Sequence, residues 1–194
     1  MKLSYLSIPL LLALPSVSAA QSVVLRGKVE DVSGTSGQFF LDCTDVDLSS
    51  SAFNLNLFVG AQTEIHGTWN GSVSNPAVVV EAIQVVQETF EIGGGGKIGE
   101  EARPHVTGAP GSLAVTFASL STSFAPLGSS GTAFLGGNPF PTGAGTIGGS
   151  GQIEFSIPIP NDPALIGVDV FGQGAVVAAG NVLLTNPDCK TLEN

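Results

Sequence analysis

Apolar and polar residues alternate in short runs along the chain after residue 20, which is the pattern of half-buried β-strands. In Ser22–Asp31, for example, Val23, Leu25 and Val29 share one face, while charged side chains largely take the other. No long stretch of this region shows sustained helical periodicity. The other strand candidates of the first half are Gly37–Cys43, Phe53–Phe58, Val59–Trp69 and Ala77–Val86. The pattern predicts an all-β protein.

The second half contains further short strand candidates, separated by turns rich in glycine, proline and serine. In Leu113–Phe117 the large apolar residues fall on alternate positions, as a half-buried strand requires. The candidates are Ser112–Leu120, Gly131–Leu135, Gly151–Ile157, Gly167–Ala178 and Asn181–Leu184. Many short strands between such turns favour a β-sandwich.

A run of four glycines, Gly93–Gly96, separates the two halves. Because glycine-rich segments are flexible, the run predicts an interdomain linker over residues 93–98. The first domain then covers residues 21–92 and the second covers residues 99–194. Together these expectations describe a small barrel-sized β-domain followed by a larger β-domain.

The first domain resembles the small five-stranded OB-like barrels of exported bacterial proteins. The resemblance covers Ser22–Glu88 and rests on the order of the strand candidates, with a glycine turn before the fourth strand. Asn70 and Gly71 form a strong hairpin signal after that strand, because both positions tolerate positive φ. The resemblance implies a closed or nearly closed barrel.

The second domain resembles a recurrent β-sandwich domain found at the C-termini of secreted proteins from planctomycete- and myxobacterium-like bacteria. The segments that carry the resemblance are Ala102–Val106, Gly108–Pro110, Ala133–Gly137, Ile159–Gly167 and Val170–Gln173. The resemblance is most specific in Ile159–Gly167, and it implies a sandwich fold without implying any chemistry. The chain departs from the pattern at Leu184–Lys190, where a final strand is expected, so the closing edge of the sandwich is left undecided.

The proline-rich segment has a structural interpretation of its own. Pro158 and Pro160 lack a backbone donor, which places them at the end or edge of a strand. Asp162 can cap a short helical turn, and Pro163 has the φ angle that suits its first position. Leu165 would then fill the core of the sandwich.

Gln173 follows this segment and has two open interpretations. If its face of the strand points inward, its side chain should hydrogen-bond backbone groups of the preceding loop. Alternatively, Gln173 contributes to a ligand-binding site together with Asp162 and Asp169.

The first 20 residues have the organisation of a secretory signal peptide. Lys2 precedes the apolar run Leu6–Leu14, and small residues in Ser16–Ala20 provide a cleavage site after Ala20. The apolar run is too short to span a bilayer, and the alternative is a buried N-terminal helix. We therefore expect a secreted protein, periplasmic or extracellular, that is not inserted in a membrane after cleavage.

The charge of the chain limits its partners. The formal net charge is −10, and loss of Lys2 with the signal peptide makes it −11. This excess disfavours nucleic acid, whose affinity for proteins depends on cations, and it disfavours anionic membrane surfaces. The expected partners are an extracellular protein or a polysaccharide.

Cys43 and Cys189 are the two cysteines of the chain. In an oxidising compartment a pair of cysteines is normally bridged, and this bridge would join the first domain to the C-terminal tail. Two free thiols are the alternative.

No catalytic set is recognisable. Gly143–Gly148 matches G-x-G-x-x-G, but no strand precedes it and no helix follows, so we expect a flexible loop. His66 and His105 lack neighbouring ligands or partners, and no G-x-S-x-G elbow is present. The sequence therefore predicts that the protein is not an enzyme.

Asp42, Asp45 and Asp47 place three carboxylates in a short span. Calcium favours clustered oxygen ligands, so the three residues are candidate calcium ligands, although their spacing is not that of an EF-hand. A solvated acidic loop is the alternative. No other cofactor is expected.

Trp69 is the single tryptophan and lies beside the Asn70-Gly71 turn. An exposed indole ring there would offer a stacking surface for a sugar. We expect an exported, non-enzymatic binding or structural module of the extracellular space or envelope. The alternatives are a carbohydrate-binding accessory protein that uses Trp69 and a secreted hydrolase that uses paired carboxylates.

Overall fold

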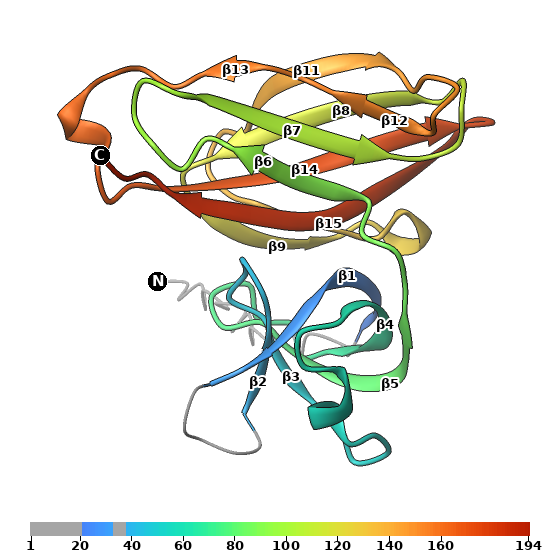
Figure 1. The fold of residues 1–194 in the computed structure, drawn as a ribbon. Helices are drawn as coiled ribbons and strands as arrows, with labels where there is room; N and C mark the ends of the chain where they lie inside the picture. The colour runs from blue at the N-terminus through green and yellow to red at the C-terminus, as the bar shows by residue number, and fades with distance from the viewer. Residues whose placement is uncertain (1–20, 33–37) are drawn as a thin grey trace, which may run out of the picture.

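The computed structural model describes residues 21–32 and 38–194. They form a closed β-barrel and a β-sandwich stacked on one another, which confirms the predicted all-β fold (Figure 1). The predicted signal peptide at residues 1–20 lies outside the described residues. Within the described part of the chain, no helix has the length and hydropathy that a membrane crossing requires.

The barrel is a five-stranded Greek-key barrel of the OB type, as expected. Its strands are β1 (Gln21–Asp31), β2 (Phe39–Leu41), β3 (Asp47–Ser49), β4 (Gln62–Trp69) and β5 (Ala77–Val85). The order around the barrel is β1-β2-β3-β5-β4, and β4 closes on β1. β3 and β5 run parallel, and the other neighbours run antiparallel. The alternating apolar residues of β1 point into the barrel core with those of β4 and β5.

The third strand lies elsewhere than predicted. Phe53–Phe58 contains the 3₁₀ helix η1 (Leu55–Phe58) instead of a strand. The side chain of Asn54 caps this helix by accepting a hydrogen bond from the backbone N–H of Asn56 at 3.2 Å. Leu55 is buried whereas Leu57 is 78% exposed, so these two apolar side chains do not share one buried face as they would in a strand.

The sandwich consists of two sheets packed face to face. Its strands are β6 (Phe90–Gly94), β7 (Glu101–Thr107), β8 (Leu113–Ser119), β11 (Phe140–Thr146), β12 (Gln152–Glu154), β13 (Ile157–Pro158), β14 (Asp169–Ala178) and β15 (Asn181–Thr191). One sheet has the order β11-β8-β14-β15. In the other sheet, β7 pairs with β6 on one side and with β12 and β13 on the other.

The glycine tract belongs to the sandwich, which differs from the linker expected at residues 93–98. Gly93 and Gly94 end β6, which forms a hairpin with β7. At Gly95 the φ angle is +66°, and a Cβ would lie 2.5 Å from the Cα of Ala102. These glycines therefore permit a close approach of two backbones, and the chain passes between the domains at residues 86–89.

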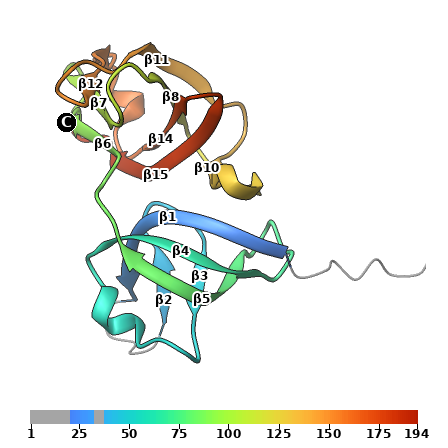
Figure 2. The ribbon, with the colours of Figure 1, turned by 90° about the vertical axis from the view of Figure 1, so that its right-hand side faces the viewer.

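A hairpin leaves the sandwich and packs on the barrel (Figure 2). It is formed by β9 (Thr122–Pro126) and β10 (Thr132–Leu135), joined through the 3₁₀ helix η2 (Gly128–Ser130). Phe124 and Phe134 of this hairpin belong to the core cluster of the barrel rather than to that of the sandwich. The two domains therefore share part of one hydrophobic core.

The closing edge of the sandwich is a complete strand. β15 continues to Thr191, well beyond the predicted Asn181–Leu184, and pairs with β14. Pro187 lies within β15, and an edge strand tolerates it because its outer side needs no ladder donor.

Candidate functional site

Three polar contacts and a disulfide join the two domains. Cys43 of the barrel is bonded to Cys189 of β15, which confirms the predicted bridge. Arg26, which is paired with Glu64 within the barrel at 2.6 Å, donates across the interface to the backbone oxygen of Leu184 at 3.1 Å. The hydroxyl of Thr122 in the hairpin donates to Asp45 of the barrel. The hydroxyl of Thr132 donates to the backbone oxygen of Val24 at 2.9 Å. These contacts fix the sandwich and its hairpin against strand β1.

Gln173 is a buried structural residue with 3% of its surface exposed. Its amide nitrogen donates to the backbone oxygens of Thr132 and Thr185, each at 2.9 Å. Its amide oxygen accepts from the backbone N–H of Phe134 at 3.0 Å. The partners therefore lie in β10 and β15, and not in the preceding loop as predicted. The pairing of β14 with β15 shifts register between Gln173 and Ala175.

Asn186 plays a similar role that the sequence did not indicate. Its side-chain oxygen accepts from the backbone N–H groups of Thr89 and Phe90, each at 3.0 Å. Its nitrogen donates to the backbone oxygen of Phe90 at 2.7 Å. Asn186 thereby joins β15 to β6 and closes one side of the sandwich.

Trp69 is buried, so the prediction of an exposed sugar platform is wrong. It is 9% exposed, and its ring centroid lies 5.0 Å from that of Phe124. Its indole N–H donates to the backbone oxygen of Ser72 at 3.0 Å. The hairpin from the sandwich covers the ring, and its residues are far from Trp69 in the sequence, so local pattern did not predict the contact.

The predicted ligand set of Asp162, Asp169 and Gln173 is not assembled. Asp162 caps the 3₁₀ helix η3 (Pro163–Leu165) by accepting from the backbone N–H of Ala164 at 2.9 Å, as the sequence indicated. Asp169 accepts a hydrogen bond from the hydroxyl of Thr191 at 2.6 Å. Both aspartates are exposed, whereas Gln173 is buried among backbone groups.

The three aspartates predicted as calcium ligands also fail to form one site, because each lies in a different local setting. Asp42 accepts a hydrogen bond from the backbone N–H of Cys43 at 2.9 Å, and Asp45 accepts from the hydroxyl of Thr122. Asp47 lies in β3 and is exposed. Among the described residues, ligand atoms converge only at Asp42, Cys43 and Cys189, where the two sulfurs form the disulfide.

Both histidines lie on strands, with His66 exposed and His105 half-buried. His66 Nε2 is 3.2 Å from a carboxylate oxygen of Glu64, and His105 Nε2 contacts Glu154 on the neighbouring strand β12. Neither is hydrogen-bonded to a hydroxyl or thiol among the interactions of the described residues, so no nucleophile and base are paired there.

A polar cavity lies where the barrel meets the sandwich. It has a volume of about 360 Å³, and Asp42, Glu88, Glu91 and Asp188 line it together with two lysines. Burial raises the pKa of Glu88, and the charges of Glu91 and Asp188 raise it further. Burial also raises the pKa of Asp42, more than the charge of Lys28 lowers it. The domain interface thus concentrates negative charge.

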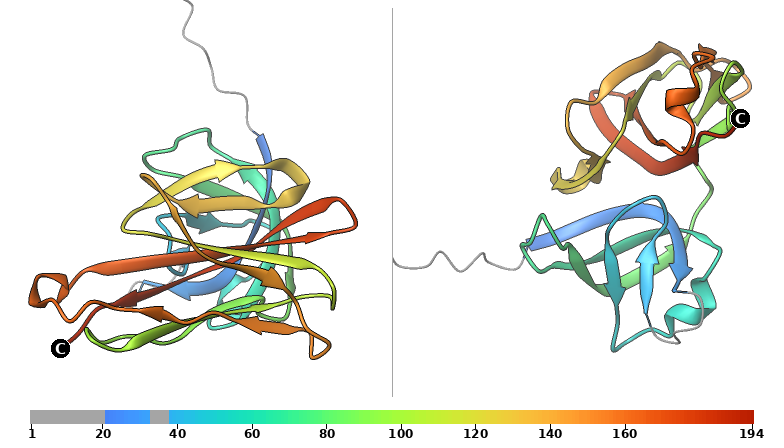
Figure 3. Two further views of the ribbon diagram at one scale, coloured as in Figure 1. Left: turned by 90° about the horizontal axis from the view of Figure 1, so that it is seen from above. Right: turned by 90° about the vertical axis from the view of Figure 1, so that its left-hand side faces the viewer.

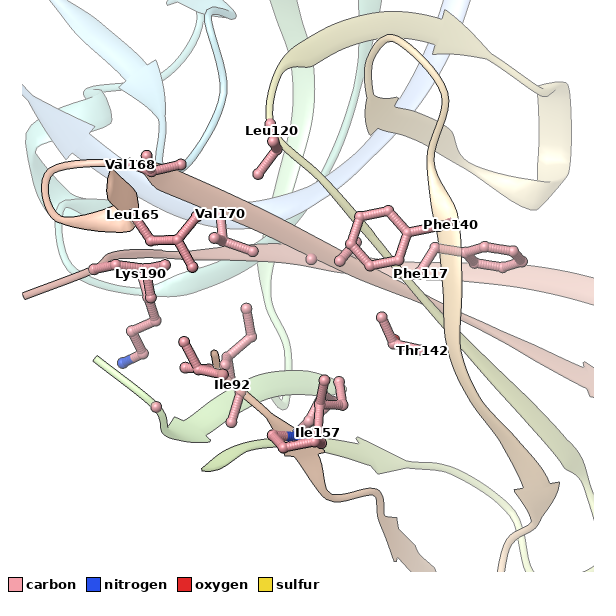
Figure 4. Close-up of a pocket in the computed structure, with 18 of the residues that line it drawn as sticks. Ile92, Phe117, Leu120, Phe140, Thr142, Ile157, Leu165, Val168, Val170 and Lys190 are labelled. Atoms are coloured by element: carbon pink, nitrogen blue, oxygen red, sulfur yellow. The ribbon is translucent and has the colours of Figure 1, made fainter. Parts of the chain in front are cut away.

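An apolar groove of about 320 Å³ opens between the two sheets of the sandwich (Figure 4). Both sheets contribute side chains, including Ile92 and Ile157 from one and Phe117 and Val170 from the other. Leu165 lies at one end, half-buried, and so lines the groove instead of filling the core as predicted. Figure 3 shows the η3 turn that carries Leu165 at the end of the sandwich that holds the C-terminus.

The groove occupies only one part of the sandwich, because the other part is filled. Phe155 and Ile153 lie against β11, where a Cβ on Gly143 would be 2.4 Å from the Phe155 ring. A Cβ on Gly145 would be 2.6 Å from Ile153. The G-x-G-x-x-G segment is therefore largely a paired strand and not the predicted flexible loop, since its glycines make room for these side chains.

The sequence did not indicate the groove, because its walls come from strands spread over residues 90–192. The prolines near the groove can be seen in the sequence, but prolines also occur in ordinary turns and so do not indicate a groove. Lys190, the charged residue in its lining, had no distinctive neighbours in the sequence.

No protein-family model matches this chain, and neither does any curated protein. A solved structure described as a tetra-tandem repeat in the extending region of a large adhesion protein is similar, with a TM-score of 0.35 and 14% identity. The similarity covers 89% of this chain and 42% of that one, so this chain spans less than half the length of that structure. A score this low carries no inference about fold or function.

Proposed function

We propose that this chain is an exported, non-enzymatic binding module of the extracellular space or envelope, and that the apolar groove is its binding site. The groove supports this proposal because a concave, largely apolar opening with few polar groups is the usual form of a small-molecule site. The disulfide and the shared hydrophobic core support it further, since they hold the sandwich in one position on the barrel.

The acidic interdomain cavity gives a secreted hydrolase less support than the apolar groove gives a binding module. Glycoside hydrolysis uses a pair of carboxyl groups, and the cavity holds Glu88, whose pKa is raised by burial, together with Asp188. However, Asp188 already accepts hydrogen bonds from the backbone N–H groups of Ile92 and Cys189. These bonds give Asp188 a structural role in joining β15 to β6. Hydrolysis of a glycoside panel by the wild type, abolished in Glu88→Gln, would establish this alternative.

Binding at the groove is tested with an environment-sensitive apolar dye titrated into the mature chain. We expect one saturable site per chain, and we expect Leu120→Asp to weaken it at least tenfold because this change places a charge on the rim. Leu120 is 63% exposed, so the substitution leaves the buried core intact. Leu57→Asp is the matched control on the barrel, where Leu57 is 78% exposed. Equal dye binding by both variants would contradict the assignment of the groove.

Export is tested separately by expressing the full chain in a bacterial host with an oxidising periplasm. We expect an exported product whose N-terminus is Gln21 and whose thiols are both blocked, because the bridge forms only in an oxidising compartment. Full-length protein retained in the cytoplasm would contradict the proposed export.

A further inference from the structure

We infer that the groove binds a single hydrocarbon chain that carries an anionic head group, with the head group placed at Lys190. This inference rests on the groove being the binding site and adds the chemical class of the ligand. Three features of the groove support the inference: its apolar lining, the prolines in the neighbouring strand edges and the position of one lysine.

The lining of the groove selects hydrocarbon for the buried part of the ligand. Its walls are formed almost wholly by aliphatic and aromatic side chains, and Thr142, whose hydroxyl donates to Thr116 at 2.9 Å, is already hydrogen-bonded. A sugar or peptide group placed there would lose its hydrogen bonds to water without replacement, which costs several kcal/mol in an apolar environment. The volume of about 320 Å³ lies at the lower end of the range for ligand sites, which favours one slender chain.

The rim of the groove is apolar as well. Leu120 is 63% exposed, Phe140 is 49% exposed, and both line the groove at its opening. Contact with a ligand chain would remove these side chains from water, and burial of apolar surface contributes about 25 cal/mol per Å².

The edges of the two sheets disfavour an added polypeptide strand as the occupant. Among the described residues, β11 pairs only with β8 and β13 only with β7, so each leaves one edge unpaired beside the groove. Pro141 lies in β11, Pro158 lies in β13, and Pro160 follows shortly after. A proline has no backbone N–H to donate, so a strand docked at these edges would find an interrupted ladder.

Lys190 supplies the charge that selects the head group. Its neighbour Cys189 faces the barrel through the disulfide, and Lys190 itself lines the groove from the adjacent position of β15 (Figure 4). It is the charged residue of the lining, and it makes no ion pair within 4.0 Å among the described residues. Lys190 also borders the acidic cavity that contains Glu88 and Asp188, so a ligand carboxylate would compete with these groups for its charge.

The experiment is displacement of the apolar dye from the mature chain by ligands that share one twelve-carbon chain. Dodecanoate, dodecanol and dodecyltrimethylammonium are compared below their micellar concentrations. We expect dodecanoate to displace the dye at about one-fifth of the dodecanol concentration, since an ion pair of about 1 kcal/mol corresponds to a fivefold effect. The cationic ligand should be the weakest, and high salt should reduce the differences.

Lys190→Met is expected to bring dodecanoate and dodecanol within twofold of each other. Lys97→Met is the matched control, because Lys97 is exposed and does not line the groove, and it should keep the preference. If the dye binds but all three ligands displace it equally, the head-group inference is wrong and the groove remains a binding site. If an extended apolar peptide displaces the dye and dodecanoate does not, the hydrocarbon inference is wrong. Absence of dye binding would overturn the proposed function itself.

Discussion

The side-chain oxygen of Gln173 accepts a hydrogen bond from the backbone N–H of Phe134 at 3.0 Å, which links the centre of the sandwich to the hairpin that covers the barrel. The same side chain donates to the backbone oxygens of Thr132 and Thr185. One buried amide thus satisfies three backbone groups in two other strands. It connects β14 with the segment that completes the core of the other domain.

Gln173→Ala should therefore destabilise the protein by about 2–3 kcal/mol, because buried backbone groups lose their hydrogen-bond partners. Chemical denaturation followed by the fluorescence of Trp69, which contacts the hairpin, measures this effect. Gln152→Ala is the control, because Gln152 is exposed in β12 and should change stability by less than about 0.5 kcal/mol. A Gln173→Ala variant as stable as the control would contradict the structural role of this amide.

Removing the disulfide should lower the free energy of unfolding by about 5 kcal/mol in the entropic view of cross-links. Cys43 and Cys189 are 146 residues apart, so the bridge constrains a long loop in the unfolded chain. The measurement compares denaturant midpoints of the wild type with and without reductant and those of the Cys43→Ser, Cys189→Ser double variant. The double variant should be insensitive to reductant. An unchanged midpoint on reduction of the wild type would show that the bridge contributes nothing to stability.

Gly143→Ala should destabilise the sandwich by about 1–3 kcal/mol, because the new Cβ would lie 2.4 Å from the ring of Phe155. Gly149→Ala is a matched control, since a Cβ there meets no atom within 4 Å. It should be neutral or stabilising by up to about 1 kcal/mol, through reduced freedom of the unfolded chain. Similar thermal stability of the two variants would argue that the segment is a loop after all.

Glu88→Gln should stabilise the protein slightly near pH 7, by less than about 1 kcal/mol given the partial exposure of the group. Burial and the charges of Glu91 and Asp188 raise the pKa of Glu88 above its ordinary value of 4.5. The folded state then binds a proton more readily than the unfolded state, so this group lowers stability as pH rises through its folded pKa. The penalty is relieved as pH falls towards and below 4.5.

Melting temperatures of the wild type and Glu88→Gln across pH 3 to 8 measure this effect. The difference between them should shrink at acid pH. Glu100→Gln, an exposed substitution in the β6–β7 turn, controls for the loss of one negative charge from an acidic protein. A Glu88→Gln variant that is less stable than the wild type at pH 7 would show that the carboxylate is favourably paired.

Much of the fold followed from local patterns. Alternation identified β1, β4, β5, β8 and β14. The resemblance to an OB-like barrel placed β1, β4 and β5 in the right architecture. Asp162 and Pro163 adopt the predicted cap and first helical position, because both act on backbone groups within two residues. The sequence was less informative wherever a residue's role depends on a partner far along the chain.

Trp69 and the glycines illustrate that limit. A tryptophan beside a hairpin turn is compatible with exposure or burial, and only the arrival of Phe124 from the hairpin of the sandwich decides it. Gly95 and Gly143 suggested flexibility, yet each permits close packing against Ala102 or Phe155, which glycine alone can accommodate. The groove likewise exists only when both sheets are in place.

The sequence by itself determined that the described part of this protein is built of β-strands with one apolar face and that two cysteines were available for a bridge. The tertiary structure alone decided which surface covers each apolar face. Alternation specifies that a side of a strand avoids water but does not specify its partner, because hydrophobic burial is not directional. The hairpin on the barrel, the amide of Gln173 between three strands and the open groove beside Lys190 all depend on that choice.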